Sequence, residues 1–455
     1  MGVQTVNPAT GEVIKDYDFM SDQHIEQVIA QAHDAFQDWR ALPLKEREAL
    51  MEKASDVLKK NKEEYAALIT QEMGKAITSA RAEIEKCAWI CEHYSKSTSE
   101  YLKPRIVKTE MSKSVVTYEP RGPIFSIMPW NFPFWQVLRF AAPNITAGNV
   151  GILSHAPIST GASLAIEDLF HQAGFPKGVF SSVIVDNDQA AKIIADKRII
   201  GVTLTGSERA GKAVASEAGQ SLKKVVLELG GSDPYVILDD ADVTEAAKVC
   251  INDRMAASGQ VCISAKRLIV VDSVYDEFLK QAQETLATYK PTDPTKDDCN
   301  FGPMARSDLR DQVHEQVQKC IENGAKCLAG GKKVDGPGFF YEPTLLVDVK
   351  PGMPAYDEEI FGPVAAIIRA KDEADAIRIA NDSPFGLGAA VFTKNIKHGE
   401  EIATNHLHAG TVAVNTAVGS DPRLPFGGIN LSGYGRECAE EGIREFVNTK
   451  TINIK

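Results

Sequence analysis

The chain contains 455 residues, too many for one ordinary hydrophobic core, so we expect two to four domains. Its 44% apolar and 25% charged residues are typical of a soluble globular enzyme. The net charge of −12, with no run of Lys or Arg interleaved with aromatic residues, argues against nucleic acid as a partner.

No apolar stretch reaches the roughly 18 residues that a membrane span needs, and the N-terminal residues lack a secretion-signal pattern, so no membrane partner is expected. The eight cysteines are scattered, without a CxxC pair, which indicates neither a zinc site nor a disulfide framework. We therefore expect a cytoplasmic protein with reduced thiols and no metal.

The first hundred residues are predicted to be helical. Apolar residues between 25 and 39 recur at helical spacing behind Ser21, a good N-cap residue. The stretches 44–60 and 75–101 continue this pattern, with Glu- and Lys-rich faces that we interpret as solvated helix surface. A short strand is expected at 114–118.

From about residue 123 onward, short apolar strands alternate with helices, which is the pattern of a parallel, doubly wound sheet. The first set has strands at 123–128, 150–153, 179–185 and 199–204, and helices at 133–145, 159–172, 187–196 and 208–219. A second α/β set runs to about 425, with helices at 241–256, 273–289 and 304–323 and a strand near 266–271. The last nine residues alternate apolar and polar, as in a strand that is either unpaired in its own chain or joined to a neighbour's sheet.

A candidate phosphate site follows the strand at 199–204. Gly206 and Ser207 stand between that strand and the next helix, where backbone N–H groups at a helix start favour an anion. The segment is not GxGxxG, and an ordinary turn with a capping residue explains it equally well. The strand–turn–helix context raises the cofactor site to equal standing with that ordinary turn.

Two residues carry the chemistry that the sequence predicts. Cys262, in Gly259-Gln-Val-Cys262, is a candidate nucleophile, and Glu228, in Leu227-Glu-Leu-Gly-Gly231, is a candidate water-activating base. An enzyme that forms a thioester and hydrolyses it needs both groups. The alternatives are a small buried cysteine and a glutamate at a strand end facing the surface.

Three residues between 129 and 139 have a possible functional role besides a structural one. Asn131, in Pro129-Trp-Asn-Phe-Pro133, is either a turn residue or an amide that donates to a developing oxyanion. Trp135 and Arg139 are four residues apart, on one helix face. If Arg139 points inward, its guanidinium suits a carboxylate on the substrate.

Taken together, the motifs resemble the aldehyde dehydrogenase superfamily over nearly the whole chain. They are Pro129-Trp-Asn-Phe-Pro133, Leu204-Thr-Gly-Ser207, Leu227-Glu-Leu-Gly-Gly231, Gly259-Gln-Val-Cys262, Glu359-Ile-Phe-Gly-Pro363 and Pro425-Phe-Gly-Gly428. The order and spacing of the six segments is far more specific than any one of them. Trp130-Asn-Phe-Pro-Phe-Trp-Gln136 and Ser420-Asp-Pro-Arg-Leu-Pro425 look most like bacterial succinate-semialdehyde dehydrogenases.

The resemblance implies an α/β fold with a Rossmann-like parallel-sheet cofactor domain (1–103 and 123–230) and a second α/β catalytic domain (231–430). It also implies a small β oligomerisation element (104–122 and 431–455), which forms a homodimer or a dimer of dimers.

The resemblance also implies a role for each matching residue. Cys262 becomes the nucleophile, Glu228 the base, and Asn131 the oxyanion donor together with the Cys262 backbone N–H. The implied cofactor-binding residues are Trp130, Ser154, Pro157, Gly206, Ser207, Glu359 and Phe361. The candidate substrate residues remain Trp135 and Arg139, which follow from their shared helix face.

Four departures from the family pattern concern the cofactor side. The family often has Lys-Pro-Ala-Glu where this chain has Ser154-His-Ala-Pro157, so a glutamate that repels a 2′-phosphate and a lysine that attracts one are both absent. NADP or NAD therefore remains open, with a preference for NADP. Residues common in the family are also replaced by Ala257, by Leu204, and by Asn430 together with Leu431.

The predicted activity is NAD(P)-dependent oxidation of an aldehyde, preferably succinic semialdehyde, to its carboxylic acid through a thioester on Cys262. The alternatives are a CoA-acylating dehydrogenase and a non-catalytic protein on the same scaffold.

Overall fold

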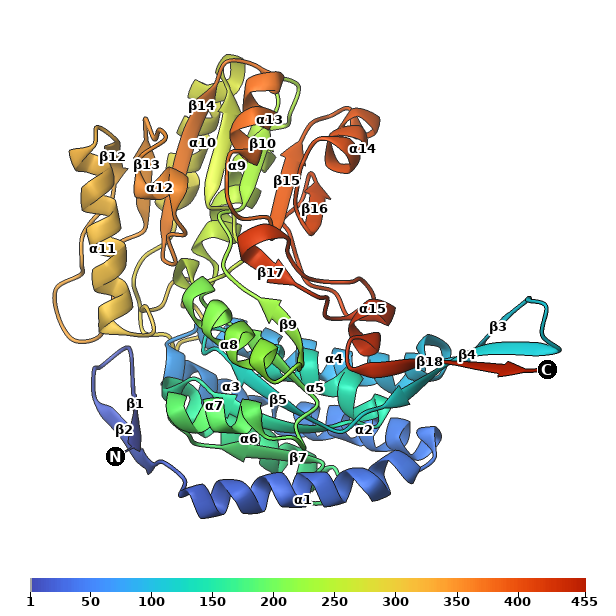
Figure 1. The fold of residues 1–455 in the computed structure, drawn as a ribbon. Coiled ribbons are helices and arrows are strands. Elements are labelled where there is room, and N and C mark those ends of the chain that lie inside the picture. Colours follow the sequence, from blue (N-terminus) through green and yellow to red (C-terminus); the bar gives the residue numbers. More distant parts are fainter. Residues whose placement is uncertain (1) are drawn as a thin grey trace.

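Two open sheets dominate the computed structural model, which describes residues 2–455, and a small three-stranded sheet projects from one side (Figure 1). The first sheet has the order β17-β9-β8-β5-β6-β7. Its strands are β5 (Pro123–Met128), β6 (Val150–His155), β7 (Phe180–Val183), β8 (Gly201–Thr205), β9 (Lys224–Glu228) and β17 (Gly433–Tyr434). Strands β5 to β9 are parallel, which confirms the predicted doubly wound arrangement.

The strand order places a topological switch point between β5 and β8. The chain moves outward from β5 through β6 to β7 and then returns to β8 on the other side of β5. In open α/β sheets, ligands bind at the carboxyl ends of the strands at such a point. The segments that follow β5 and β8 contain Trp130, Asn131, Gly206 and Ser207.

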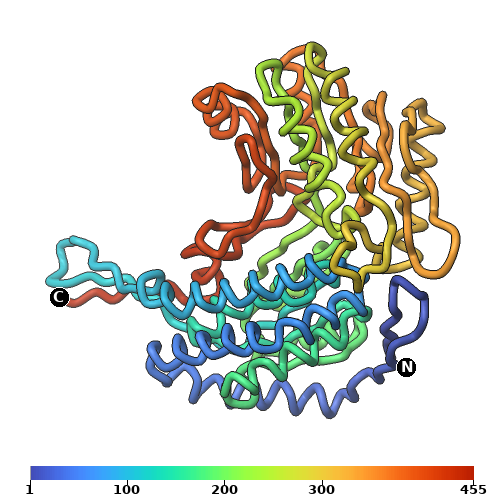
Figure 2. Tube along the Cα trace, turned by 180° about the vertical axis from the view of Figure 1, so that it is seen from behind, coloured from blue at the N-terminus to red at the C-terminus, as the bar shows by residue number. Residues whose placement is uncertain are grey.

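The helices of this half follow the predicted pattern closely. They are α1 (Asp22–Ala41), α2 (Leu44–Lys60), α3 (Lys62–Met73), α4 (Ile77–Tyr101), α5 (Trp135–Ala147), η1 (Pro157–Ser159), α6 (Thr160–Gln172), α7 (Asn187–Ala195) and α8 (Glu208–Gln220). Ser21 caps α1 by accepting from the His24 N–H, as predicted. The prediction of helix from the start of the chain was wrong, because β1 (Gly2–Val6) and β2 (Val13–Asp18) form a hairpin there, seen beside the N-terminus in Figure 2.

The second sheet has seven strands in the order β12-β13-β14-β11-β10-β15-β16. They are β10 (Pro234–Ile237), β11 (Arg267–Val271), β12 (Lys326–Ala329), β13 (Thr344–Val347), β14 (Val364–Ala370), β15 (Gly388–Phe392) and β16 (Thr411–Val414), and only β12 is antiparallel to its neighbour. Along β11, Leu268 and Val270 pack into one core, and Ile269 and Val271 pack into another. Burial on both faces is what a parallel sheet covered by helices requires.

The remaining helices belong to this second half and to the C-terminal segment. They are α9 (Val243–Met255), η2 (Ala256–Gly259), η3 (Asp272–Val274), α10 (Tyr275–Leu286), α11 (Ser307–Glu322), α12 (Pro354–Asp357), α13 (Glu373–Asn381), α14 (Ile396–Asn405), η4 (Asn430–Ser432) and α15 (Ala439–Arg444). Within residues 2–455, no helix has the length and apolar character needed to cross a membrane.

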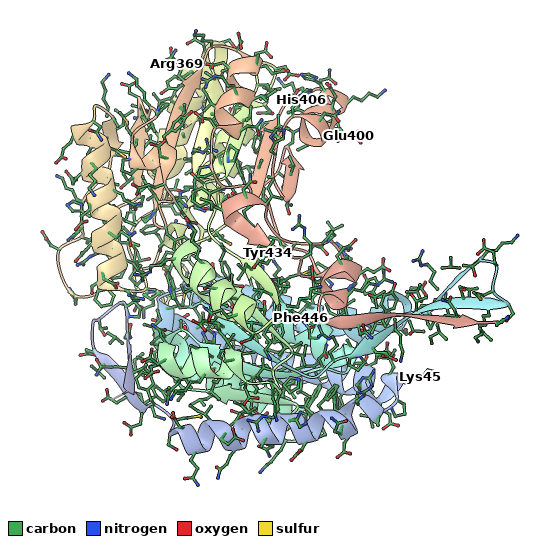
Figure 3. All side chains as sticks on the ribbon, viewed as in Figure 1. Lys45, Arg369, Glu400, His406, Tyr434 and Phe446 are labelled. Atoms are coloured by element: carbon green, nitrogen blue, oxygen red, sulfur yellow. The ribbon has the colours of Figure 1, made fainter. Side chains whose placement is uncertain are left out.

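The projecting sheet contains β3 (Arg105–Val107), β4 (Lys113–Pro120) and β18 (Val447–Ile454). The C-terminal strand was predicted to be unpaired in its own chain or to join a neighbour. The first alternative is wrong, because β18 pairs with β4 of the same chain along its full length, from Val447 opposite Pro120 to Ile454 opposite Lys113. Within residues 2–455 the other edge of β18 pairs with no strand. Phe446, at the base of this sheet (Figure 3), packs edge-to-face against Phe140 of α5 and anchors it to the main body.

The predicted start of the C-terminal part of the oligomerisation element, at residue 431, differs from the strand pairing in the structure. Residues 431–455 were assigned to the oligomerisation element, but β17 pairs with the end of β9, with Gly433 opposite Glu228. The labelled Tyr434 lies where the two halves of the molecule meet (Figure 3). Of that predicted range, only β18 belongs to the projecting sheet, and the segment around β17 helps to build the centre of the molecule.

Candidate active site

A cavity of about 630 Å³ opens at the carboxyl ends of β5, β8 and β9, where the two halves of the chain meet. It brings together eight of the residues that the sequence singled out, namely Trp130, Asn131, Gly206, Ser207, Glu228, Cys262, Glu359 and Phe361. Five separate segments of the chain supply these residues. Their convergence makes this cavity the candidate active site.

One wall of the cavity is the N-terminus of α8. The Ser207 side chain caps the helix by accepting from the Ala210 N–H, and Gly206 donates to the Glu228 carbonyl at 2.9 Å. The positive side chains of Arg209 and Arg306 also line the cavity. A helix N-terminus flanked by two arginines fits the pyrophosphate of a dinucleotide.

The adjoining wall is aromatic. Trp130 and Phe361 meet edge-to-face, with ring centroids 5.8 Å apart, and Glu359 stands beside them. Apolar ring surface next to a carboxylate fits a nicotinamide and its ribose hydroxyls. Ser154 and Pro157 lie farther along the same edge, at the end of β6 and the start of η1, and neither lines this cavity.

The segment before Cys262 has an unusual backbone. Ala257, Ser258 and Gly259 all have positive φ, at 47°, 55° and 73°, which is rare for residues with a Cβ. At Gly259 an added Cβ would lie 2.2 Å from the Gly362 carbonyl oxygen, so only glycine fits. Strained backbone persists only where the surroundings impose it, and it is concentrated at functional sites.

The buried Arg254 side chain supplies much of that constraint. Its guanidinium donates to the Gly259 carbonyl at 3.0 Å, to the Ile360 carbonyl at 2.6 Å and to the Val364 carbonyl at 2.7 Å. It therefore joins the segment before the nucleophile to the segment that carries Glu359. Burial lowers the pKa of Arg254 to about 10, so the group stays charged at neutral pH.

Cys262 is half-buried at the cavity wall. Burial raises the pKa of the Cys262 thiol to about 11, while the positive charges of Lys266 and Arg139 act in the opposite direction. Within residues 2–455 the Cys262 backbone N–H donates to no other group. It is therefore free to donate to an oxyanion that forms beside the sulfur.

Asn131 lies against the nucleophile segment. Its amide donates to the Gln260 carbonyl at 2.9 Å, and its oxygen accepts from the Gln136 side chain at 3.1 Å. These two bonds fix the amide orientation and leave one of its two N–H groups for the cavity. The geometry therefore suits the predicted oxyanion role.

Glu228 is buried, and both of its carboxyl oxygens lack a hydrogen-bond partner. Burial, reinforced by the nearby Glu437 carboxyl, raises the pKa of Glu228 well above its usual range, against the pull of Arg139. Gly427 makes room for the side chain, since a Cβ there would lie 2.7 Å from the Glu228 Oε1 atom. A buried, unpartnered carboxyl at a cavity wall is the kind of group that serves as a general base.

Arg139 points inward, but in this structure it pairs with a side chain of its own chain and not with a substrate. Its Nε atom forms a buried ion pair with Glu437, and its guanidinium stacks over Phe426 at 4.6 Å. This ion pair uses Nε, and among residues 2–455 the two terminal nitrogens of Arg139 take no part in it. Trp135 is also buried and packs under Lys86, and neither Trp135 nor Arg139 lines the cavity described above.

The aldehyde dehydrogenase family model matches residues 1–452. The chain belongs to the aldehyde dehydrogenase family. It is 45% identical to a Synechocystis protein named "Probable succinate-semialdehyde dehydrogenase [NADP(+)]", over 100% of both chains. It is 43% identical to the Escherichia coli NAD(P)+ succinate semialdehyde dehydrogenase Sad over 98% of this chain and 97% of that one.

Solved structures agree with this assignment. The succinic semialdehyde dehydrogenase of Streptococcus pyogenes, solved with NADP+, has a TM-score of 0.97 at 38% identity and covers 99% of both chains. The structure of Gox0499 has a TM-score of 0.98 at 42% identity and covers 100% of both chains.

Two supporting residues of this aldehyde dehydrogenase escaped the sequence analysis. Arg254 looks like an ordinary charged residue near a helix end, and Glu83 lies in a Glu-rich stretch that we interpreted as helix surface. Glu83 is in fact buried, pairs with Lys75 and accepts from the Phe134 and Trp135 N–H groups at 3.0 and 3.1 Å. It thereby caps α5 and fixes the segment that carries Asn131, although no local signal distinguishes it from its exposed neighbours.

Replacing Asn131 by Ala should lower kcat by about a hundredfold to a thousandfold, because the oxyanion loses one donor. The aldehyde KM should change far less, since the donor acts mainly on charge that develops in the transition state. Steady-state kinetics with Asn131→Ala measure both parameters. Asn131→Asp is the isosteric control, and it should be at least as impaired because a carboxylate repels an oxyanion. An unchanged kcat in Asn131→Ala would contradict the oxyanion role.

Proposed function

We propose that this enzyme oxidises succinic semialdehyde to succinate with NADP+, through a thioester on Cys262. The observation that carries the proposal is the single cavity that unites Cys262, Glu228 and Asn131 with the N-terminus of α8. The substrate and cofactor preferences draw support from the names of relatives at 40–45% identity across nearly the whole chain.

The proposed mechanism assigns a role to each of these side chains. The Cys262 thiolate attacks the aldehyde carbon, and the Asn131 amide and the Cys262 N–H donate to the oxyanion. A bound nicotinamide cofactor supplies the hydride acceptor, so that Cys262 is left carrying an acyl thioester. Glu228, once ionised, takes a proton from water, which hydrolyses the thioester.

The cofactor is held, in this proposal, by residues from both halves of the molecule. Ser207 and the first turn of α8 bind the pyrophosphate, Glu359 binds the nicotinamide ribose, and Trp130 and Phe361 flank the ring. The segment Ser154–Pro157 contains no carboxylate, so it does not repel a 2′-phosphate. That absence favours NADP over NAD.

Arg139 is proposed to bind the remote carboxylate of the substrate through its two terminal nitrogens. Replacing Arg139 by Met should lower kcat/KM for succinic semialdehyde about tenfold to a hundredfold more than for an uncharged aldehyde of similar length, because a charge-assisted hydrogen bond is lost.

The same substitution also removes a partner of the buried Glu437, which affects stability and both substrates. Glu437→Gln is the matched control, because it breaks the ion pair and keeps Arg139. A charged-to-uncharged ratio of kcat/KM that is unchanged in Arg139→Met would exclude the carboxylate role.

We propose that the projecting sheet is the oligomerisation element, through which the chain forms a homodimer or a dimer of dimers. Its strand β18 exposes nearly all of its side chains. The eight cysteines are free thiols, which supports our proposal of a cytoplasmic enzyme.

The test is the formation of reduced cofactor, followed by near-ultraviolet absorbance, for succinic semialdehyde and an uncharged aldehyde with NADP+ and NAD+ in turn. We expect the highest kcat/KM for the charged aldehyde with NADP+. Turnover that requires added CoA would favour a CoA-acylating dehydrogenase, against which the presence of Glu228 argues. No turnover, with no protection from thermal unfolding by either cofactor, would favour a non-catalytic protein.

A further inference from the structure

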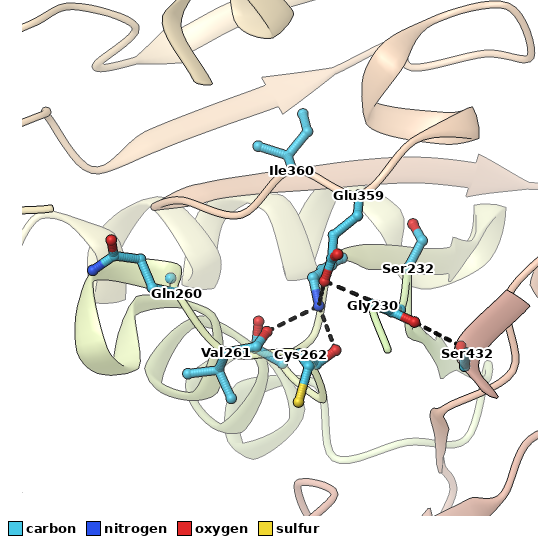
Figure 4. A network of polar contacts seen from close by, with 12 residues as sticks. Gly230, Ser232, Gln260, Val261, Cys262, Glu359, Ile360 and Ser432 are labelled. Carbon is cyan, nitrogen blue, oxygen red and sulfur yellow. Dashed lines mark hydrogen bonds and ion pairs between the residues drawn. The ribbon is translucent and has the colours of Figure 1, made fainter. Parts of the chain in front are cut away.

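Lys266 occupies a buried position directly behind the nucleophile. Its side chain is 3% exposed. Its ammonium donates to the Val261 carbonyl at 2.9 Å and to the Cys262 carbonyl, and it pairs with the Glu359 Oε1 atom at 3.2 Å (Figure 4). A lysine ammonium has three donors, so these partners use all of them.

The same contacts reach the segment that carries the base. The Glu359 Oε1 atom that pairs with Lys266 also accepts from the Gly231 N–H at 3.2 Å, three residues after Glu228. In Figure 4, dashed lines mark these contacts at the labelled Val261, Cys262 and Glu359. One positive charge therefore connects the nucleophile segment, the base segment and the carboxylate that is proposed to hold the ribose.

The charges that face Cys262 have opposite signs. Lys266 and Arg139 are positive and favour a thiolate, whereas Glu359 and Asp233 are negative and oppose it. Glu228 and Glu437, which face Arg139 from the neighbouring strand and the C-terminal segment, weaken the contribution of that arginine. Lys266 is four residues from Cys262 and is held in place by three polar contacts, whereas Arg139 is held by an ion pair with Glu437 and by stacking over Phe426.

We propose that Lys266 is a positioning residue that fixes the Cys262 backbone and supplies the positive charge that favours its thiolate, and that Glu359 limits this effect by pairing with the same ammonium. The proposal rests on the proposed role of Cys262 as nucleophile. It predicts opposite effects for the two partners of one ion pair. A lysine that only satisfied two buried carbonyls would alter stability and leave the acidity of the thiol unchanged.

The experiment measures the rate at which iodoacetamide alkylates Cys262 as a function of pH, with no cofactor or aldehyde present. Cys327 is the other cysteine that is not fully buried, so all proteins carry Cys327→Ser, and peptide mass spectrometry confirms the alkylated residue. Below the thiol pKa, the alkylation rate is proportional to the thiolate fraction, so raising that pKa by about one lowers the rate about tenfold.

We expect Lys266→Met to lower the alkylation rate about tenfold or more at pH 8 and to move the midpoint of the profile to higher pH. Glu359→Gln should raise the rate by a few fold and move the midpoint to lower pH. Lys266→Gln, which keeps a short donor and removes the charge, should behave as Lys266→Met does.

A Lys266→Met profile within twofold of the parent would overturn the proposal. So would a Glu359→Gln profile that moves in the same direction as that of Lys266→Met. If both Lys266 variants fail to fold, the Glu359→Gln variant tests the proposal through the direction in which its midpoint moves. The Glu359 side chain is only partly buried, so we expect this variant to fold.

Because the readout needs neither turnover nor cofactor, it is separate from the test of the proposed function. If a variant without Cys262 kept the activity, the proposed function would be wrong. The alkylation profiles of the proteins that keep Cys262 would still show whether Lys266 favours the thiolate.

Discussion

Replacing Cys262 by Ser should lower kcat for aldehyde oxidation by about four orders of magnitude, because the reaction loses its nucleophile. The oxygen of serine is nearly isosteric with sulfur, but its hydroxyl has a far higher pKa and no base contacts it. The other groups of the site are retained, and they give only weak catalysis without a nucleophile. The measurement is the steady-state rate of cofactor reduction.

The matched control is Cys327→Ser, since Cys327 is the other partly buried thiol and lies on β12, outside the cavity. We expect this variant to keep the parental kcat. Thermal unfolding with and without cofactor should show that Cys262→Ser still folds and binds. A Cys262→Ser enzyme with more than about a tenth of the parental kcat would contradict covalent catalysis by this residue.

Replacing Glu228 by Gln should slow steady-state turnover by about a hundredfold to ten-thousandfold, because water loses its general base. Thioester formation should be much less affected. The expected time course is therefore a burst of about one reduced cofactor per active site, followed by a slow phase. Stopped-flow absorbance measures both phases.

The amide of glutamine has the size of the carboxyl group, and Glu228 makes no hydrogen bond that the substitution would break. Glu437→Gln is the control for a change of charge in the same buried cluster, and it should not produce a burst. If Glu228→Gln slowed the burst and the steady state equally, Glu228 would act before the thioester and the assignment would be wrong. Relief of the slow phase by CoA would show that the thioester accepts other nucleophiles.

The sequence predicted the first sheet well, because its strands and helices have strong and regular patterns. Strand β5 was predicted with its observed bounds, and Ser21 was recognised as a helix cap. The hairpin β1–β2 was missed because its strands are short and largely exposed, so apolar alternation is weak. The pairing of β18 was also missed, since an alternating strand does not indicate which edge it joins.

In the candidate site too, the sequence predicted some residues and missed others. Motifs identified eight of the residues that line the cavity, because each lies in or next to a segment with glycine, proline or a cysteine, whereas Arg209 and Arg306 were missed. The residues that hold these side chains in place could not be predicted from the sequence. Arg254, Glu83 and Lys266 are charged, and charged residues are usually exposed, so only their burial in the fold reveals them.

The central claim is that the oxidised substrate is held on Cys262 before water releases it. The direct test mixes Glu228→Gln with succinic semialdehyde and oxidised cofactor, stops the reaction with acid during the burst, and maps the acylated residue by peptide mass spectrometry. The account predicts a succinyl group on the peptide that contains Cys262, in an amount equal to the burst. Cofactor reduction with no acyl group on Cys262, or with the acyl group on another residue, would contradict it.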